Sequence, residues 1–177
     1  MKNNFVLLFA LLVSAALSAE SADPLASSVD RVGFPKDYDT KYHVLRTTNK
    51  PAEKKVVRVF GNDLAASVTN AAQLPYPYGS IIVMETAKAQ EDAQGKVLVD
   101  KKGNFQPEKA LGLHVMRREK GFGESYGMNR SGEWEYVEYR PDGSWLTPPA
   151  KSTSCAKCHI QAGMERDFVY HGSFGSN

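Results

Sequence analysis

The sequence predicts an α+β fold that is mainly β, with a few short helices. Four segments have side chains that divide between two faces with period two, and each segment is bounded by Gly, Pro, Asn or Asp residues. One longer segment reads as a capped helix, and a second short helix is expected near the C-terminus. The chain length suits a single core, and no internal repeat or low-complexity tract indicates a second domain.

The expected elements follow one another in a simple order. The predicted strands span residues 56–60, 81–86, 111–118 and 134–139, and a Pro-Asp-Gly turn at residues 141–143 closes the last of them. Residues 62–74 are predicted to form a helix, because Asn62 is a favourable N-cap and Pro75 stops the helix. Residues 96–99 are expected to form a short strand in a surface hairpin, flanked by two charged loops.

Alternation divides the predicted strands into two faces. One face is uniformly apolar and is expected to form the core against the predicted helix; it holds Val57, Val59, Ile81, Val83, Leu111, Leu113 and Val115. The opposite face holds Arg58, Phe60, Ile82, Met84, Gly112, His114 and Met116. A solvent-facing surface would carry several Lys, Glu or Thr residues, so this second face fits the wall of a pocket for a flat apolar group. The alternative is that Arg58 and His114 are ordinary surface residues.

The first 19 residues have the pattern of a secretory signal peptide. Lys2 precedes an apolar run over residues 5–17 that is too short to span a bilayer, and the small residues Ser18 and Ala19 follow it. We therefore expect cleavage near Ser18 or Ala19, a periplasmic or secreted protein, and no stable membrane anchor. Residues 20–32 are expected to be a loose lead-in and residues 33–174 the folded domain. The formal net charge of +2, without any basic run, argues against nucleic acid as a partner.

The motif that indicates chemistry is Cys155-Ala-Lys-Cys158-His159. Two cysteines at this spacing fit one helical turn and can bond to both vinyl groups of a porphyrin, while the adjacent histidine supplies an axial iron ligand. A dithiol redox motif would need a βαβ setting, which does not precede this motif. A structural zinc site needs about four ligands, and the chain has no third cysteine. We therefore predict one covalent haem c, which requires export from the cytoplasm and leaves no cysteine for a disulfide.

The order of short motifs along residues 33–174 resembles the cytochrome P-460 family. That family includes hydroxylamine-oxidising monohaem cytochromes and the related cytochromes c′-beta. The motifs are Gly33-Phe-Pro-Lys-Asp-Tyr38, the Arg58 strand, Gly79-Ser-Ile-Ile-Val-Met-Glu85, Gly112-Leu-His-Val115, the Trp134 strand, the haem motif and Asp167-Phe-Val-Tyr170. The resemblance implies a curved antiparallel sheet with haem c on one face, His159 as proximal ligand on a C-terminal helix, and a homodimer like that of the c′-beta members.

The resemblance also implies roles for three pocket residues, two of which depart from the family pattern. Arg58 matches a distal-pocket arginine of the hydroxylamine-oxidising members. Met84 stands where those enzymes have the lysine that cross-links to the porphyrin, and His114 stands where they have a distal glutamate. Lys88 shares the strand parity of Met84 but lies about 13 Å further along an extended strand, so it is not expected to replace that lysine. The red-shifted haem of the hydroxylamine oxidisers is therefore not expected.

Three classes of function remain open. The preferred one is a haem protein that binds or detoxifies nitric oxide or a similar small ligand, as the c′-beta members do, with Phe60, Ile82 and Met84 as a crowded apolar distal side. The second is a haem oxidoreductase, peroxidase-like or hydroxylamine-oxidising, in which His114 shuttles a proton and Arg58 stabilises developing charge. The third is an electron-transfer cytochrome with Met84 or His114 as sixth ligand. The sequence does not identify its periplasmic redox partner.

Overall fold

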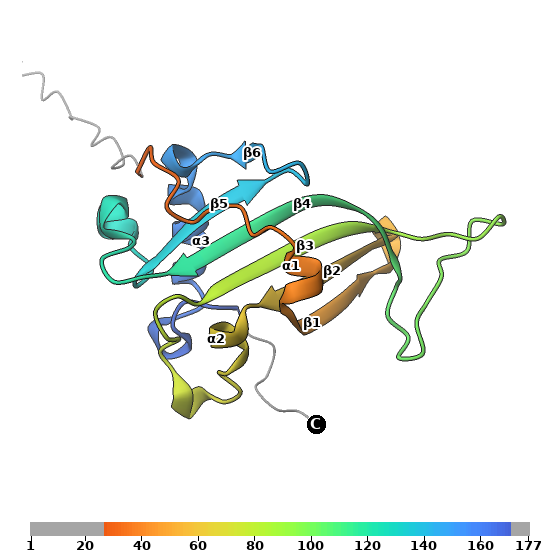
Figure 1. Ribbon diagram of the computed structural model, residues 1–177, viewed down its shortest axis with the longest axis horizontal. Coiled ribbons are helices and arrows are strands. Elements are labelled where there is room, and N and C mark those ends of the chain that lie inside the picture. Colours follow the sequence, from red (N-terminus) through yellow and green to blue (C-terminus); the bar gives the residue numbers. More distant parts are fainter. Residues whose placement is uncertain (1–26, 171–177) are drawn as a thin grey trace, which may run out of the picture.

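The computed structural model describes residues 27–170 as an open sheet of six antiparallel strands with a few short helices (Figure 1). The strands follow chain order across the sheet, so every hydrogen-bonded neighbour is also a neighbour in sequence. Their bounds are His43–Lys50 (β1), Lys55–Gly61 (β2), Ile81–Ala89 (β3), Pro107–Arg118 (β4), Trp134–Tyr139 (β5) and Trp145–Thr147 (β6). The predicted signal peptide at residues 1–19 lies outside the described residues. Within residues 27–170, no helix has the length and apolar character needed to cross a membrane.

The mainly β prediction is confirmed, and β2 to β5 correspond to the four predicted strands. The sequence pattern does not predict β1 and β6, which form the two edges of the sheet. β1 is mostly polar, and β6 has three residues, so neither shows a sustained apolar alternation. The segment between β3 and β4 projects from one end of the sheet (Figure 1). The strand expected at residues 96–99 contributes isolated bridges there, from Val97 to Glu91 and from Val99 to Phe105.

Short helices connect and follow the strands. α1 (Tyr38–Lys41) precedes β1, α2 (Asp63–Ala66) follows β2, and α3 (Thr153–Ile160) carries the Cys-X-X-Cys-His motif after β6. The remaining helical turns are of the 3-10 type: Pro51–Glu53 (η1), Ala71–Gln73 (η2), Glu124–Asn129 (η3), Pro149–Lys151 (η4) and Met164–Arg166 (η5).

The helix predicted over residues 62–74 is much shorter than expected. Asn62 caps it as predicted, because its side chain accepts a hydrogen bond from the Ala65 amide at 3.0 Å. The helix ends after one turn, and residues 67–70 (Ser-Val-Thr-Asn) follow. These β-branched and short polar side chains have low helix propensity, which explains the early end. Asn70 then caps the separate turn η2.

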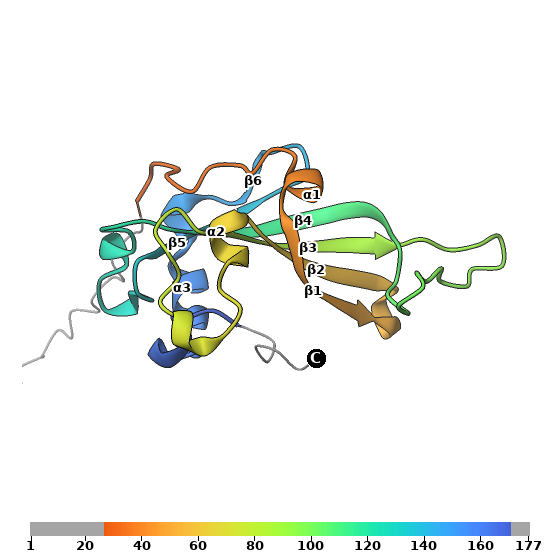
Figure 2. The same ribbon diagram turned by 60° about the horizontal axis from the view of Figure 1, so that its bottom comes forward.

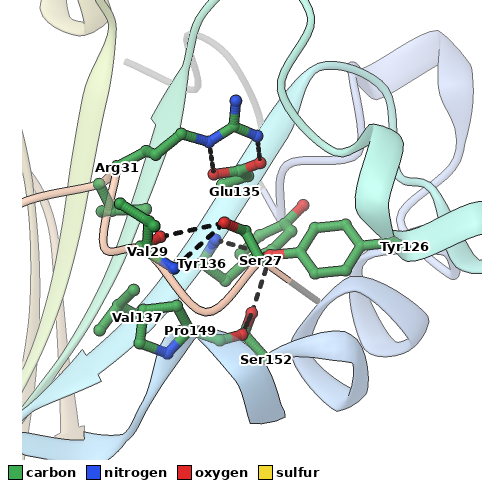
Figure 3. A pocket seen from close by; sticks show the side chains of 10 residues that line it. Ser27, Val29, Arg31, Tyr126, Glu135, Tyr136, Val137, Pro149 and Ser152 are labelled. Carbon is green, nitrogen blue, oxygen red and sulfur yellow. Dashed lines mark hydrogen bonds and ion pairs between the residues drawn. The ribbon is translucent and has the colours of Figure 1, made fainter. Parts of the chain in front are cut away.

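The N-terminal segment and α1 cover one face of the sheet (Figure 2). The core on this face consists of Val32, Tyr38, Phe60, Val83, Leu113, Val115, Val137 and Tyr139. Residues 27–32 are therefore not the loose lead-in that the composition predicts. Arg31 donates two hydrogen bonds to Glu135 of β5, as Figure 3 shows, and the Tyr139 hydroxyl donates to Asp30 at 2.8 Å.

The opposite face of the sheet carries α3 and the segment that follows α2 (Figure 2). Its core consists of Ala65, Val68, Tyr76, Ile82, Met116, Tyr126, Trp134, Tyr136, Ala156 and Val169. α2 thus packs on a different face from the one predicted for it. This second core does not fill the face completely, and a cavity remains beside it.

Candidate functional site

A cavity of about 980 Å³ lies between the sheet and α3. Its volume is near the upper end of the range of about 300–1,000 Å³ that is usual for small-molecule pockets. Both cysteines and the histidine of the motif line it, together with side chains from β1 to β5 and from the segment after α2. The lining is mostly apolar, so the cavity suits a ligand with a large apolar surface.

Helix α3 brings Cys155 and Cys158 to this cavity as free thiols. Burial raises the pKa of the Cys155 thiol to about 11, and the nearby Glu138 carboxylate adds to the effect. A redox-active dithiol requires the opposite, a thiolate with a lowered pKa. The surroundings of Cys155 therefore argue against a thioredoxin-like role and leave both thiols available for thioether bonds.

His159 is held in an orientation that suits a metal ligand. Its Nδ1 lies 2.7 Å from the backbone oxygen of Phe168, and because a carbonyl oxygen can only accept, Nδ1 carries the proton and Nε2 keeps its lone pair. Burial lowers the pKa of the His159 imidazole, which favours the neutral form that binds metals. The rings of Tyr136 and Tyr170 pack against the imidazole, with centroid distances of 4.6 and 5.4 Å.

One line of residues crosses this face of the sheet, and we call it the cross-sheet row. Its members oppose one another directly in successive antiparallel strands, and directly opposed residues share a face. The row runs through Arg46 (β1), Val59 (β2), Met84 (β3), His114 (β4), Glu138 (β5) and Thr147 (β6). All of its members except Thr147 line the cavity.

The cross-sheet row contains a histidine–carboxylate pair. His114 Nδ1 lies 2.6 Å from Glu138 Oε1, and the Thr147 hydroxyl donates a hydrogen bond to Oε2 of the same carboxylate. The carboxylate fixes one nitrogen of the imidazole, and Nε2 remains available to exchange a proton with a ligand or with solvent. Glu138 is a site residue that the sequence pattern missed, although it lies in a predicted strand. Its link to His114 depends on the register between β4 and β5.

Arg46 is a second residue that the sequence pattern missed. The register of β1 shifts between Val44 and Arg46, so an extra residue is accommodated and the Arg46 side chain joins the cavity face. Its guanidinium has no hydrogen-bond or ion-pair partner among the described residues. A guanidinium without a partner can bind a carboxylate through two parallel N–H···O hydrogen bonds, in bidentate geometry. Because β1 is itself a polar edge strand with a bulge, periodicity gives no signal for this position.

The donor set of the cavity fits a haem. A protein-bound haem is usually held by an apolar pocket around its macrocycle, an axial side-chain ligand to its iron and a cation near its propionates. The cavity offers a mostly apolar lining, the Nε2 of His159 and the guanidinium of Arg46, with two thiols on the same helical turn as His159. His159, Cys155 and Cys158 are the residues that would hold the group.

The structure brings three of the five predicted pocket residues into this cavity, namely Ile82, Met84 and His114. The prediction for Arg58 and Phe60 is wrong, because both lie on the opposite face. Val59, and not Arg58, is the residue of β2 that opposes Met84. The Phe60 side chain is 1% exposed and belongs to the core beneath the N-terminal segment.

The error arises because β2 is covered on both faces. Val56 and Phe60 are buried on one side of β2, while Val59 packs against the core on the other side. Both faces of the strand therefore carry apolar side chains. For such a strand the hydrophobic pattern does not indicate which side chains lie on which face of the sheet. The pairing of β2 with β3 determines this. The same pairing moves Val57 and Val59 from the predicted core face to the cavity face.

Arg58 belongs to a buried polar cluster instead. Its Nε and Nη2 donate to Glu85 Oε1 at 2.9 and 2.7 Å, and the Tyr38 hydroxyl donates to the other oxygen of the same carboxylate. We expect Arg58→Gln to lower the free energy of unfolding by about 1.5–3 kcal/mol, because the buried Glu85 carboxylate loses charged hydrogen bonds. Urea denaturation measures this loss. If Arg58→Gln altered the haem spectrum and left the stability unchanged, Arg58 would lie in the ligand pocket after all.

The sequence profile of the Cytochrome P460 family matches residues 35–171. No curated protein matches the chain. The matched range includes all six strands and α3, and thus every element that lines the cavity. The haem that characterises such cytochromes agrees with the donor set on α3. Because the match covers most of its 177 residues, the chain belongs to the cytochrome P460 family and is a haem-binding cytochrome.

Proposed function

We propose that this protein is a periplasmic monohaem c-type cytochrome that binds and detoxifies a small neutral nitrogen oxide such as nitric oxide. In this proposal Cys155 and Cys158 form thioether bonds and His159 is the axial ligand. The observation that carries it is the hydrogen bond from His159 Nδ1 to Phe168, which leaves a neutral Nε2 in the cavity that both thiols line. A haem held there supplies an iron that binds diatomic ligands and exchanges one electron.

The apolar part of the lining supports a small neutral ligand. Val44, Leu45, Val59 and Met84 line the cavity with side chains that offer water no strong hydrogen bond. Beside these four side chains a charged ligand would lose hydration without gaining hydrogen bonds, whereas a neutral diatomic ligand loses little. Arg46 is available to neutralise a haem propionate.

Covalent attachment is tested by mass spectrometry of the protein purified under denaturing conditions. We expect the mature chain to carry the additional mass of one haem, because Cys155 and Cys158 both line the cavity on one helical turn. Cys155→Ala and Cys158→Ala together should make the haem extractable with acidic acetone. A haem that acidic acetone extracts from the unmodified protein would contradict the proposal.

The absence of a lysine cross-link is tested by the optical spectrum of the reduced protein. No lysine of the described chain lines the cavity, and Lys88 forms an ion pair with Glu108 at 3.0 Å. We therefore expect the bands of an ordinary haem c. A strongly red-shifted Soret band would show that a residue does cross-link to the porphyrin, and hydroxylamine oxidation would then become the leading function.

The His114–Glu138 pair favours a second candidate function, a peroxidase-like haem oxidoreductase. A histidine whose Nδ1 is held by a carboxylate can move a proton through Nε2. Arg46, in place of the predicted Arg58, would be the cation of such a site. The third possibility, an electron carrier, would need Met84 or His114 as sixth ligand, and both line the cavity.

The periplasmic location and the homodimer remain predictions. The location rests on residues 1–19, which lie outside the described residues, and the homodimer rests on the resemblance to the c′-beta members. Both can be measured on protein expressed with its native N-terminus. Cell fractionation gives the location, and size-exclusion chromatography with light scattering gives the number of chains in the assembly.

A further inference from the structure

The carbonyl group that orients His159 lies in a tightly folded loop after α3. Asp167 and Phe168 both have left-handed backbone conformations, with φ angles of 49° and 59°. This conformation is unfavourable for residues other than glycine and persists only where surrounding contacts hold it. The Phe168 amide donates to the Gly163 carbonyl at 2.9 Å and closes the loop. The position of the Phe168 carbonyl therefore depends on whatever anchors residues 163–168.

The anchor is the side chain of Asp167. It is 6% exposed, and its Oδ2 accepts a hydrogen bond from the Tyr76 amide at 2.9 Å. Arg118 of β4 forms an ion pair with the same oxygen, with Nε at 3.4 Å, and also donates a hydrogen bond to the Tyr76 carbonyl. The ring of Tyr78 covers the Arg118 guanidinium at 4.6 Å. Asp167 thus connects the loop to the end of β4 and to the segment that precedes β3.

We propose that Arg118 and Asp167 are positioning residues for the axial ligand. They hold the Phe168 carbonyl against His159 Nδ1, and so set the strength of the iron–imidazole bond and the reduction potential. The proposal rests on the haem ligation by His159 proposed above. A ligating imidazole that donates a stronger hydrogen bond is a more basic ligand and stabilises ferric iron. Releasing the Phe168 carbonyl should therefore raise the reduction potential and weaken the iron–imidazole bond.

Arg118→Gln separates this positioning effect from simple electrostatics. Loss of a positive charge near the haem would by itself lower the reduction potential, whereas release of the Phe168 carbonyl raises it. We expect a rise equivalent to about a tenfold shift of the ferric–ferrous equilibrium, or about 59 mV for one electron. The iron–histidine stretching frequency of the reduced protein, measured by resonance Raman spectroscopy, should fall. For a six-coordinate haem, proton NMR of the ferric cyanide adduct reports the imidazole orientation instead.

Asp167→Asn should change the potential and the stretching frequency in the same directions as Arg118→Gln. Both side chains act on one carbonyl, so the double variant should show less than the sum of the two single effects. Arg118→Lys keeps the charge but loses the planar guanidinium, and it should also lower the stretching frequency. This variant provides the readout if Arg118→Gln does not fold.

Glu85→Gln is the matched control. Glu85 is likewise a buried carboxylate that pairs with an arginine, Arg58, but it lies on the opposite face of the sheet. This variant should lower the melting temperature without changing the stretching frequency. A lowered potential in Arg118→Gln, or an unchanged stretching frequency in both Arg118 variants, would overturn the positioning role. Wild-type protein without covalent haem would instead contradict the proposed function.

Discussion

Replacement of His159 by glycine should leave a covalently attached haem that has lost its protein nitrogen ligand. The proposed thioether bonds would not depend on the imidazole, whereas Nε2 is the donor that we assign to the iron. We expect the optical spectra of the oxidised and reduced protein to change, because the iron would exchange an imidazole for a weaker ligand such as water. Added imidazole should restore the original spectrum, because the deleted side chain leaves space between Tyr136 and Tyr170.

His43→Ala is the control for this experiment. His43 is exposed, pairs with Asp63 at 2.8 Å and does not line the cavity. The control should keep the wild-type spectrum and ligand affinity. A wild-type spectrum in the His159→Gly variant would show that another residue, such as His114, already holds the iron. Protein that emerges without haem would mean that attachment itself needs His159, and expression with imidazole in the medium then provides the rescue test.

The sequence predicts the central strands well because each is an apolar segment bounded by turn-forming residues. β3 and β4 contribute to both cores, and the parity assigned to Ile82, Met84 and His114 agrees with the register. β2 shows the limit of this reasoning. Its two faces are both covered, so the side on which Arg58 lies is decided by hydrogen bonding to β3 and not by the residues of β2 themselves.

Some residues of the candidate site can be predicted from the sequence, whereas others are found only in the structure. Cys155, Cys158 and His159 can be predicted because one helical turn holds all three. The groups that complete the site come from other elements. Glu138 reaches His114 through strand register, and Arg46 joins the cavity through a bulge. The Phe168 carbonyl is a backbone group, so no residue type at that position could have identified it as the partner of His159.

His114→Ala should lower any turnover of hydrogen peroxide by about 10²- to 10⁴-fold, the usual contribution of a positioned acid–base group. The Nδ1 of His114 is held by Glu138, and only Nε2 remains for proton transfer. Glu138→Gln should lower turnover in the same direction, since an uncharged amide holds His114 Nδ1 less firmly than the carboxylate does. Binding of nitric oxide or carbon monoxide should change little in either variant, because a neutral diatomic ligand needs no proton. Stopped-flow spectroscopy measures both reactions on the same protein.

The spin state of the resting ferric haem, taken from its optical spectrum, determines the interpretation of the ligand-binding and peroxide experiments. We expect a high-spin ferric haem, because the proposed function needs an open position at the iron for the ligand. In that case Met84→Ala should speed ligand binding, since Met84 fills part of the cavity between Val59 and His114 in the cross-sheet row. A low-spin resting haem that becomes high-spin in Met84→Ala or His114→Ala would identify that side chain as the sixth ligand. Such a haem would bind added ligands slowly or not at all, and the protein would then be an electron carrier with its second axial ligand supplied by the sheet.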